Sequence, residues 1–247
     1  MKLFAHWGTQ ITLMATVLIG TLGMGSPPSL ALPEEEVLQK LAPVIVFMVT
    51  NNEGAPVIVS VPVEGDEPAE VAGAFMSRSD AESLATQLRQ ESPNIADQVQ
   101  ITPTSLAEVY QLEFASEGQD NDIDFVFIPV QEQVVNAGDL LGGDELRGVP
   151  LFVARGGPNR GYLTIEQENR PQAVPFYFEY EQAQALADRF KAANPELADT
   201  VVIQVLLLEG IINTLRTEDD PQLSNIVLVP SQESLGYLQQ IRQQQQQ

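Results

Sequence analysis

Cysteine is absent from this 247-residue sequence, and histidine and tryptophan occur only once each, as His6 and Trp7. Zinc and haem sites and the Ser-His-Asp and Cys-His nucleophile systems need imidazole or thiolate in most of their known forms. Only carboxylate, lysine or hydroxyl chemistry is left for catalysis, and no such group is set apart by its spacing. We therefore expect no catalytic residue, no metal site, no cofactor and no enzyme activity. Without disulfides, burial alone has to hold the fold together.

Basic residues are also scarce, because 12 lysines and arginines stand against 34 aspartates and glutamates, giving a net charge of −22. Nucleic acids and anionic lipid surfaces attract basic faces, so both should repel this chain. Nucleic acid is therefore excluded as a partner. The acidity serves either solubility or the attraction of basic polypeptides, and composition leaves both interpretations open.

The first 31 residues have the pattern of a secretory signal peptide. Lys2 supplies the positive end, residues 11–24 are mostly apolar, and Ser29-Leu30-Ala31 is a small-x-small cleavage pattern. A retained membrane anchor is the alternative, but it needs roughly 20 apolar residues, and two prolines follow the apolar stretch. We predict cleavage after Ala31, which leaves residues 32–247 as an exported domain that does not span a membrane.

An internal repeat is the strongest pattern in the sequence, which matches itself at a shift of about 102 residues. Residues 79–97 match residues 181–199, and residues 127–132 match residues 228–233 with one residue deleted. At the front, residues 42–47 match residues 149–154. Repeat one therefore covers about residues 42–137 and repeat two about residues 148–240.

Each repeat predicts the same order of elements. An apolar strand, a turn rich in glycine and asparagine, and a second strand form a hairpin, and a short strand then leads into a helix with i, i+3, i+4, i+7 apolar spacing. Another strand, a short helix, an acidic loop, an apolar strand and a last helix follow. This order predicts an α+β fold of two similar units, related by a pseudo-twofold axis and packed as one unit.

Local signals mark several helix ends. Ser79 with Glu82, and Ser105 with Glu108, fit the capping-box pattern. A short helix should begin after Pro33, because three glutamates follow it and suit the positive end of a helix. The glutamine-rich tail, residues 239–247, is of low complexity and should fray.

Two segments resemble ligand loops. Residues 120–124 resemble the opening of a calcium loop, but Phe125 and Gln131 stand where that loop needs glycine and glutamate. Residues 156–161 are glycine-rich but lack the Gly-Lys-Ser/Thr ending of a phosphate loop, and they join two predicted strands. A solvated acidic loop and a hairpin turn explain the two segments better.

The remaining unusual feature is apolar and aromatic. On a strand, Phe176, Phe178 and Tyr180 share one face and Tyr177 lies on the other. Such segments form either core or an exposed groove for extended polypeptide, since contiguous apolar patches usually mark partner sites. If part of this region lines a groove, the candidate polypeptide-binding residues are Phe176, Phe178, Tyr180, Leu206, Leu207 and Ile211.

Five segments, taken in order, have a recognisable sequence. They are Ala42-Pro43-Val44-Ile45-Val46-Phe47, Ala74-Phe75-Met76-Ser77-Arg78-Ser79-Asp80-Ala81, Gly148-Val149-Pro150-Leu151-Phe152, Val174-Pro175-Phe176-Tyr177-Phe178 and Val227-Leu228-Val229-Pro230-Ser231. Together they resemble the Tic22-like family, and the resemblance spans almost all of residues 32–247. Plant members of that family are soluble proteins of the chloroplast intermembrane space that assist preprotein import. Its cyanobacterial members lie in the periplasm and thylakoid lumen and are linked to outer-membrane biogenesis.

The resemblance implies a chaperone-like protein of the periplasm or thylakoid lumen, without a catalytic motif. Its expected partners are unfolded or extended polypeptides in transit and an outer-membrane barrel-assembly protein of the Omp85 class. The alternative is an adaptor that docks on an outer-membrane assembly or translocon component without holding clients.

Overall fold

The structure is a computed structural model that describes residues 32–61, 69–94, 96–116, 124–143, 146–167 and 170–244. The predicted signal peptide and the acidic residues 118–122 lie outside this part of the chain. Within it, no helix has the length and apolar character needed to cross a bilayer.

Helices and strands alternate along the chain. The helices are α1 (Glu34–Leu41), α2 (Arg78–Glu91), α3 (Leu106–Ser116), α4 (Gln131–Leu140), α5 (Tyr180–Ala193), α6 (Leu208–Thr217) and α7 (Gln232–Gln244), with short 3-10 helices η1 (Ala96–Gln98), η2 (Pro195–Thr200) and η3 (Pro221–Asn225). The strands are β1 (Ile45–Thr50), β2 (Ile58–Val61), β3 (Ala69–Phe75), β4 (Gln100–Ser105), β5 (Asp124–Ile128), β6 (Pro150–Gly156), β7 (Gly161–Tyr162), β8 (Ile165–Gln167), β9 (Arg170–Tyr177), β10 (Val202–Leu207) and β11 (Ile226–Val229).

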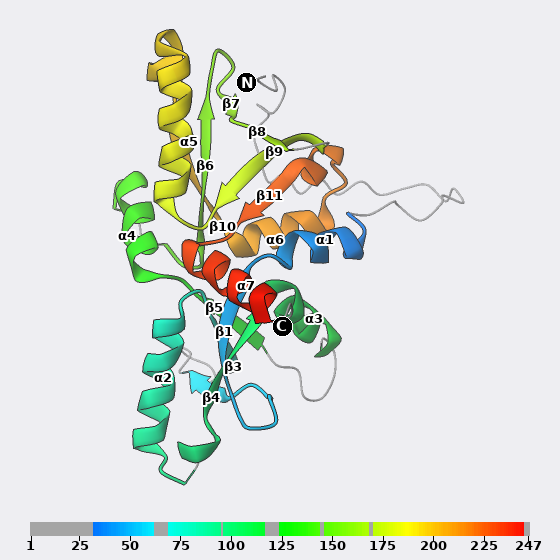
Figure 1. Cartoon of the computed structure of the whole chain (residues 1–247), viewed down its shortest axis with the longest axis vertical. Coiled ribbons are helices and arrows are strands. Elements are labelled where there is room, and N and C mark those ends of the chain that lie inside the picture. Colours follow the sequence, from blue (N-terminus) through cyan, green and yellow to red (C-terminus); the bar gives the residue numbers. More distant parts are fainter. Residues whose placement is uncertain are drawn as a thin grey trace, which may run out of the picture.

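The strands form two mixed sheets with the same connectivity. In the first, β1 pairs antiparallel with β3 and β4, and β5 pairs parallel with the other side of β3. In the second, β6 pairs antiparallel with β9 and β10, and β11 pairs parallel with β9. The α+β class is therefore confirmed, while the pseudo-twofold axis stays a prediction. Figure 1 shows the sheets one above the other along the long axis, with α5 above and α2 below on one side.

At the carboxyl end of each half, the backbone follows the register expected from the sequence. The Met76 N–H donates to the Ile128 carbonyl at 2.9 Å, and the Phe178 N–H donates to the Val229 carbonyl at 3.3 Å. Both pairs join the end of a central strand to the parallel edge strand beside it. The matched segments 127–132 and 228–233 thus occupy equivalent places.

At the front of each half, the expected register is wrong by two residues. The Leu106 N–H donates to Val44 and the Leu208 N–H donates to Val149. Leu106 and Leu208 are equivalent in the repeat, so the residues that accept their N–H groups, Val44 and Val149, are equivalent too. The sequence alignment had matched Val44 with Leu151 instead. A shift of two residues keeps every side chain on the same face of a strand, so the apolar pattern alone could not exclude it.

The start of α2 also differs from the prediction. Ser77, not Ser79, is the N-cap, and its hydroxyl accepts the Ser79 N–H at 3.2 Å. Glu82 pairs with the Arg78 side chain at 2.8 Å, so the Ser79–Glu82 capping box does not form. A serine stands at both positions, and only the end of β3 decides which one caps the helix.

The second predicted capping box is confirmed at the start of α3. The Ser105 N–H donates to Glu108 Oε2 at 2.8 Å, and the Glu108 N–H donates to Ser105 Oγ at 3.1 Å. Hydrogen bonds from the Thr104 hydroxyl and from Ser105 hold the pKa of Glu108 below its usual value. The predicted helix after Pro33 is confirmed as α1, with three glutamates in its first turn.

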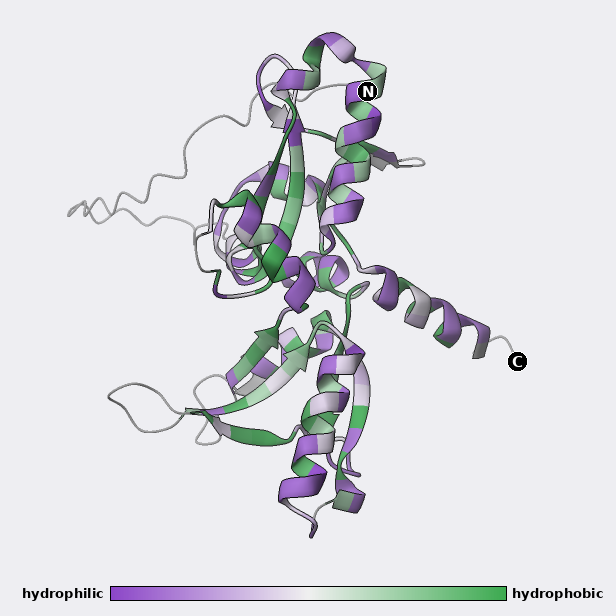
Figure 2. Cartoon of the chain, turned by 90° about the vertical axis from the view of Figure 1, so that its left-hand side faces the viewer, coloured by the Kyte–Doolittle hydropathy of each residue, from purple (hydrophilic) through white to green (hydrophobic). Residues whose placement is uncertain are grey.

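One apolar core is shared by both halves. Side chains of β1, β3 and α3 from the first half and of β6, β9 and α6 from the second belong to a single cluster, which α1 also joins. On the opposite faces, each sheet has its own cluster, with α2 on the first sheet and α5 on the second. Figure 2 shows apolar strands running between polar outer helix faces.

The last helix of each half packs on the sheet of the other half. Ala137 of α4 is buried against β6 and α5, whereas Tyr237 and Leu238 of α7 pack on the cluster of β1 and α2. The Tyr237 ring lies edge-on to the Phe47 ring at 6.0 Å, and the buried Ser234 hydroxyl donates to the Ile45 carbonyl at 2.8 Å. The halves are therefore interlocked by exchanged helices.

Candidate functional site

Phe176 and Phe178 lie in the shared core. Phe176 is 2% exposed and Phe178 is 5% exposed, and both belong to the cluster between the two halves. They share a face, as the strand pattern predicted, and Tyr177 faces the cluster of the second sheet. Both phenylalanines are therefore core residues, and Phe178 also borders a small hollow between the halves.

The other candidate residues are divided between two faces. Leu206 and Ile211 are half-buried and pack against the shared core, and Leu207 is half-buried at the end of β10. Tyr180 packs on the opposite face, with its ring 5.8 Å from that of Phe152. The expected common face for Tyr180 and Phe178 is wrong, because β9 ends at Tyr177 and α5 begins at Tyr180.

The structure describes one of the two segments that resemble ligand loops and only the end of the other. Residues 156–161 form the turn between β6 and β7, with Gly156 opposite Gly161 and the Gly157 N–H donating to Thr200 Oγ1 at 2.8 Å. The predicted hairpin turn is confirmed. Of the calcium-like segment, residues 120–123 lie outside the described residues, and Asp124 begins β5. In the described part of the chain, no cluster of three metal-ligating side chains occurs.

A groove of about 350 Å³ runs beside β5, which we call the β5 groove. Residues of β5 and α6 line it, and Tyr110 and Glu113 of α3 contribute as well. Its lining combines apolar and charged side chains: Tyr110, Phe127, Ile212, Glu113, Glu209 and Arg216. A groove of this size and mixed lining is typical of a binding site.

Glu209 is a half-buried carboxyl group in the lining of the β5 groove. Burial raises its pKa, and this effect is partly offset by hydrogen bonds, including those from the Val149 N–H at 3.1 and 3.3 Å. Gly148 makes this approach possible, since a Cβ on it would lie 2.7 Å from a Glu209 oxygen. Gly148 also has a φ of +125°, which disfavours other residues.

A second and larger groove, about 640 Å³, lies between α1 and β11. We call it the β11 groove. Lys40 of α1 reaches across and donates to the Ser224 and Ile226 carbonyls at 2.7 and 2.9 Å. Burial lowers the pKa of Lys40, and the nearby Glu36 partly offsets this. Lys40 therefore anchors α1 on the edge strand of the second sheet.

A smaller hollow of about 140 Å³ lies where the halves meet. Met76 and Phe178, at equivalent places of the two halves, line it together with Glu132, Glu179 and Glu233. Burial raises the pKa of Glu179, which accepts the Gln232 N–H at 2.9 Å.

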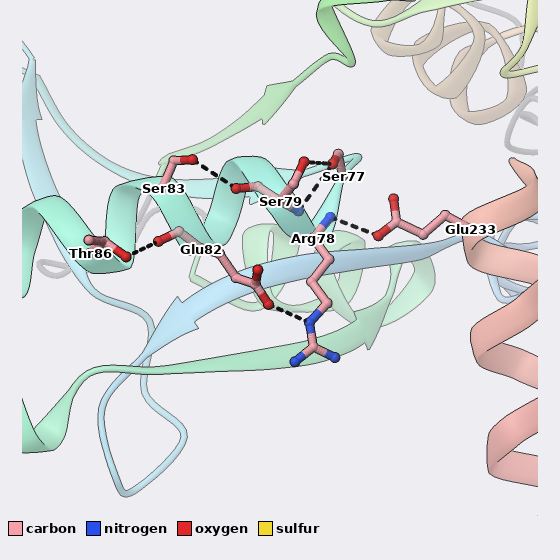
Figure 3. A network of polar contacts seen from close by, with 7 residues as sticks. All are labelled: Ser77, Arg78, Ser79, Glu82, Ser83, Thr86 and Glu233. Carbon is pink, nitrogen blue, oxygen red and sulfur yellow. Dashed lines mark hydrogen bonds and ion pairs between the residues drawn. The ribbon is translucent and has the colours of Figure 1, made fainter.

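The exchanged helices also cap the long helices across this boundary. Glu233 of α7 accepts the Arg78 N–H at 3.1 Å, as Figure 3 shows. Gln133 of α4 accepts the Tyr180 N–H at 2.9 Å. Arg78 and Tyr180 are the first residues of α2 and α5, so each half satisfies a helix amino end in the other. Glu233 and Gln133, which line the 140 Å³ hollow, therefore have a structural role, because they accept hydrogen bonds from the amino ends of helices.

Residues 7–243 match the Tic22-like family. The chain belongs to this family. Anabaena Tic22, a protein of protein transport, is 30% identical and superimposes with a TM-score of 0.73, over 85% of this chain and 97% of that one. Tic22 from Plasmodium falciparum, at 20% identity, has a TM-score of 0.63 over 83% of this chain and 97% of its own, and so shows the same fold. No curated protein matches the sequence at a significant level.

The Anabaena relative connects the Tic22-like family with protein transport. Both named structural relatives are Tic22 proteins.

The sequence pattern did not single out the groove residues. Phe125 and Phe127 belong to an apolar strand that was expected, but nothing in the sequence shows that this strand pairs with β3 alone among the described strands. Glu209 is one of 34 acidic residues, and its burial depends on Gly148 and Val149, which are distant in the chain. One signal for the grooves was available in the sequence. Residues 125–127 and residues 226–228 are equivalent in the internal repeat, and each segment lines a groove.

Proposed function

We propose that this protein is a chaperone-like holder of polypeptides in transit through an exported compartment, the periplasm or thylakoid lumen, where it assists protein transport and outer-membrane biogenesis. The observation that carries the proposal is the pair of grooves beside the edge strands β5 and β11 in a Tic22-like fold. Both grooves are large enough to take several side chains of a client.

The lining of the grooves suits an unfolded client. Apolar side chains such as Phe127 and Ile212 offer surface for the apolar residues that an unfolded chain exposes. Glu113 and Glu209 beside them, on a chain of net charge −22, favour basic segments. The same charge keeps the protein itself soluble when its grooves are open.

The leader pattern at residues 1–31 supports export. Lys2, the apolar stretch and the Ala31 cleavage pattern together are typical of a protein that crosses a membrane before it folds. Its clients would then be met on the far side of that membrane. This agrees with a role in transport beyond the cytoplasm.

Aggregation assays test the proposal directly. A chemically denatured client is diluted into buffer with the protein in several-fold molar excess, and light scattering is followed. Suppression by the wild type is expected, and the Val126→Asp variant should suppress less because Val126 lines the β5 groove and is 45% exposed. Val202→Asp is the matched control, since Val202 is 52% exposed on β10, away from either groove.

Failure of the wild type to suppress aggregation would remove the chaperone-like proposal. In that case the adaptor function takes its place, with docking on an outer-membrane barrel-assembly protein of the Omp85 class. Co-purification of such a membrane protein with the chain, unaffected by denatured client, is the expected result for an adaptor.

A further inference from the structure

Among the described residues, the β5 strand pairs along one of its edges only. Its residues pair with β3 in parallel, and the Met76 N–H donates to the Ile128 carbonyl. In a parallel pair, alternate residues of a strand direct both backbone groups to the same neighbour. Asp124, Val126 and Ile128 therefore bond to β3, whereas Phe125 and Phe127 direct their N–H and C=O groups away from it.

No other strand among the described residues pairs with this outer edge of β5. The equivalent edge of β11 is different. There the Ile226 carbonyl accepts Lys40, and the Ile226 N–H donates to Leu223. The edge of the second sheet is thus partly covered by its own chain, while the edge of the first sheet faces the β5 groove.

We propose that an extended polypeptide segment binds in the β5 groove by adding to β5 as a further strand of the first sheet. This inference rests on the proposed function and specifies how the client is held. Two N–H donors and two C=O acceptors, on Phe125 and Phe127, face the groove, and only a polypeptide backbone offers the matching groups at strand spacing.

The groove also selects the side chains of the added strand. Side chains on one face lie toward Phe127 and Ile212, and those on the other face lie beside the exposed Val126. Glu113 and Glu209 outnumber Arg216 in the groove, so basic residues are favoured over acidic ones. Glu113 and Glu209 lie on α3 and α6, so the basic side chains of the client face these helices. Its apolar side chains alternate with them and lie beside Val126.

A second copy of this chain is a poorer occupant. Each copy has a net charge of −22, so two copies that meet edge to edge repel each other. Sedimentation over a range of concentrations distinguishes this case. A dimer that Phe127→Pro abolishes would show that β5 pairs with itself, and it would overturn the client proposal.

The backbone contribution is tested with a proline substitution. Proline at position 127 removes an N–H that points into the groove and leaves the bonds between β5 and β3 intact. Phe127→Ala is the matched control, because it loses the same side chain but keeps the N–H. The probe is a short peptide of alternating valine and lysine, and its affinity is measured by fluorescence anisotropy.

Phe127→Pro should bind the peptide at least about tenfold more weakly than Phe127→Ala, a difference of about 1.4 kcal/mol. Both variants are first compared by thermal melting to establish that they fold. Equal affinity of the two folded variants would overturn strand addition. A peptide with glutamate in place of lysine should bind more weakly to the wild type, and equal binding would overturn the charge selection.

Cross-linking provides a second measurement that does not depend on the stability of a proline variant. The chain has no cysteine, so Val126→Cys supplies a single thiol beside the groove. Cysteine is then placed at each position of the peptide in turn. Neighbouring strands bring directly opposite side chains of the same face within disulfide reach. Because a peptide of alternating residues can bind in registers that differ by two residues, cross-links should appear at every second peptide position.

The pattern of cross-linking decides between the binding modes. A period of two supports strand addition, whereas uniform cross-linking or a period of three to four residues would overturn it. The proposed function itself fails if the wild type does not suppress aggregation of a denatured client. Suppression that persists equally in Phe127→Pro and Phe127→Ala would remove the strand-addition inference alone.

Discussion

Replacing Phe178 with alanine tests whether the aromatic segment is core or groove. Phe178 is 5% exposed, belongs to the core shared by both halves, and has one side toward the 140 Å³ hollow between them. Phenylalanine-to-alanine changes in a core cost about 3–5 kcal/mol. Because a hollow already borders the ring, we expect a loss near the lower end, about 3 kcal/mol.

The assay is urea unfolding followed by circular dichroism, with client binding measured on the same samples. Phe176→Ala is the matched comparison, and it should cost more because Phe176 is 2% exposed and its ring lies 6.1 Å from that of Tyr162. The Phe178→Ala variant should still bind clients at temperatures where it is folded. A loss below about 1 kcal/mol together with weakened client binding would refute the assignment to the core.

Further predictions concern pH, cooperativity and processing. Burial raises the pKa of Glu209, so the contribution of this side chain to folding stability is complete at low pH and declines as the pH rises above about 4.3, the ordinary pKa of a glutamate. The melting temperature of Glu209→Gln should therefore change less with pH above this value than the melting temperature of the wild type. Removal of α7 (Gln232–Gln244) should destabilise the first half, which would show as lost amide-exchange protection in β1, and unchanged protection would argue against the exchanged helices. The intact chain should unfold in one calorimetric transition, and two transitions would show autonomous halves. Protein purified from the exported compartment should lack indole fluorescence, because cleavage after Ala31 removes Trp7; tryptophan emission would contradict cleavage.

Much of the secondary structure could be predicted from the sequence because its signals are local. The apolar spacing at 81, 84, 85 and 88 and its copy at 183, 186, 187 and 190 correspond to α2 and α5. Ser105 and Glu108 are three residues apart, so their reciprocal bonds form as soon as the helix does. The hairpin turn at residues 156–161 depended likewise on neighbouring residues.

Predictions were wrong where two local solutions were nearly equivalent. Ser77 and Ser79 are both suitable N-cap residues, and the position at which β3 ends makes Ser77 the N-cap of α2. A shift of two residues in β6 preserves the alternation of faces, so only the bond between Leu208 and Val149 fixed the register. Tyr180 was assigned to a strand face, although its side chain already belongs to the first turn of α5.

The sequence by itself determined the export leader pattern, the duplicated order of elements, the acidity and the absence of imidazole and thiolate chemistry in residues 32–247. Only the tertiary structure decided that α4 and α7 exchange between the halves. It also decided that, among the described strands, β5 has a neighbour on one edge only, while Lys40 bonds to the edge strand β11. The physical reason is that composition and periodicity describe which face of an element is buried. They do not describe which distant element buries that face. The groove beside β5 depends on this packing of distant elements, so it could not be predicted.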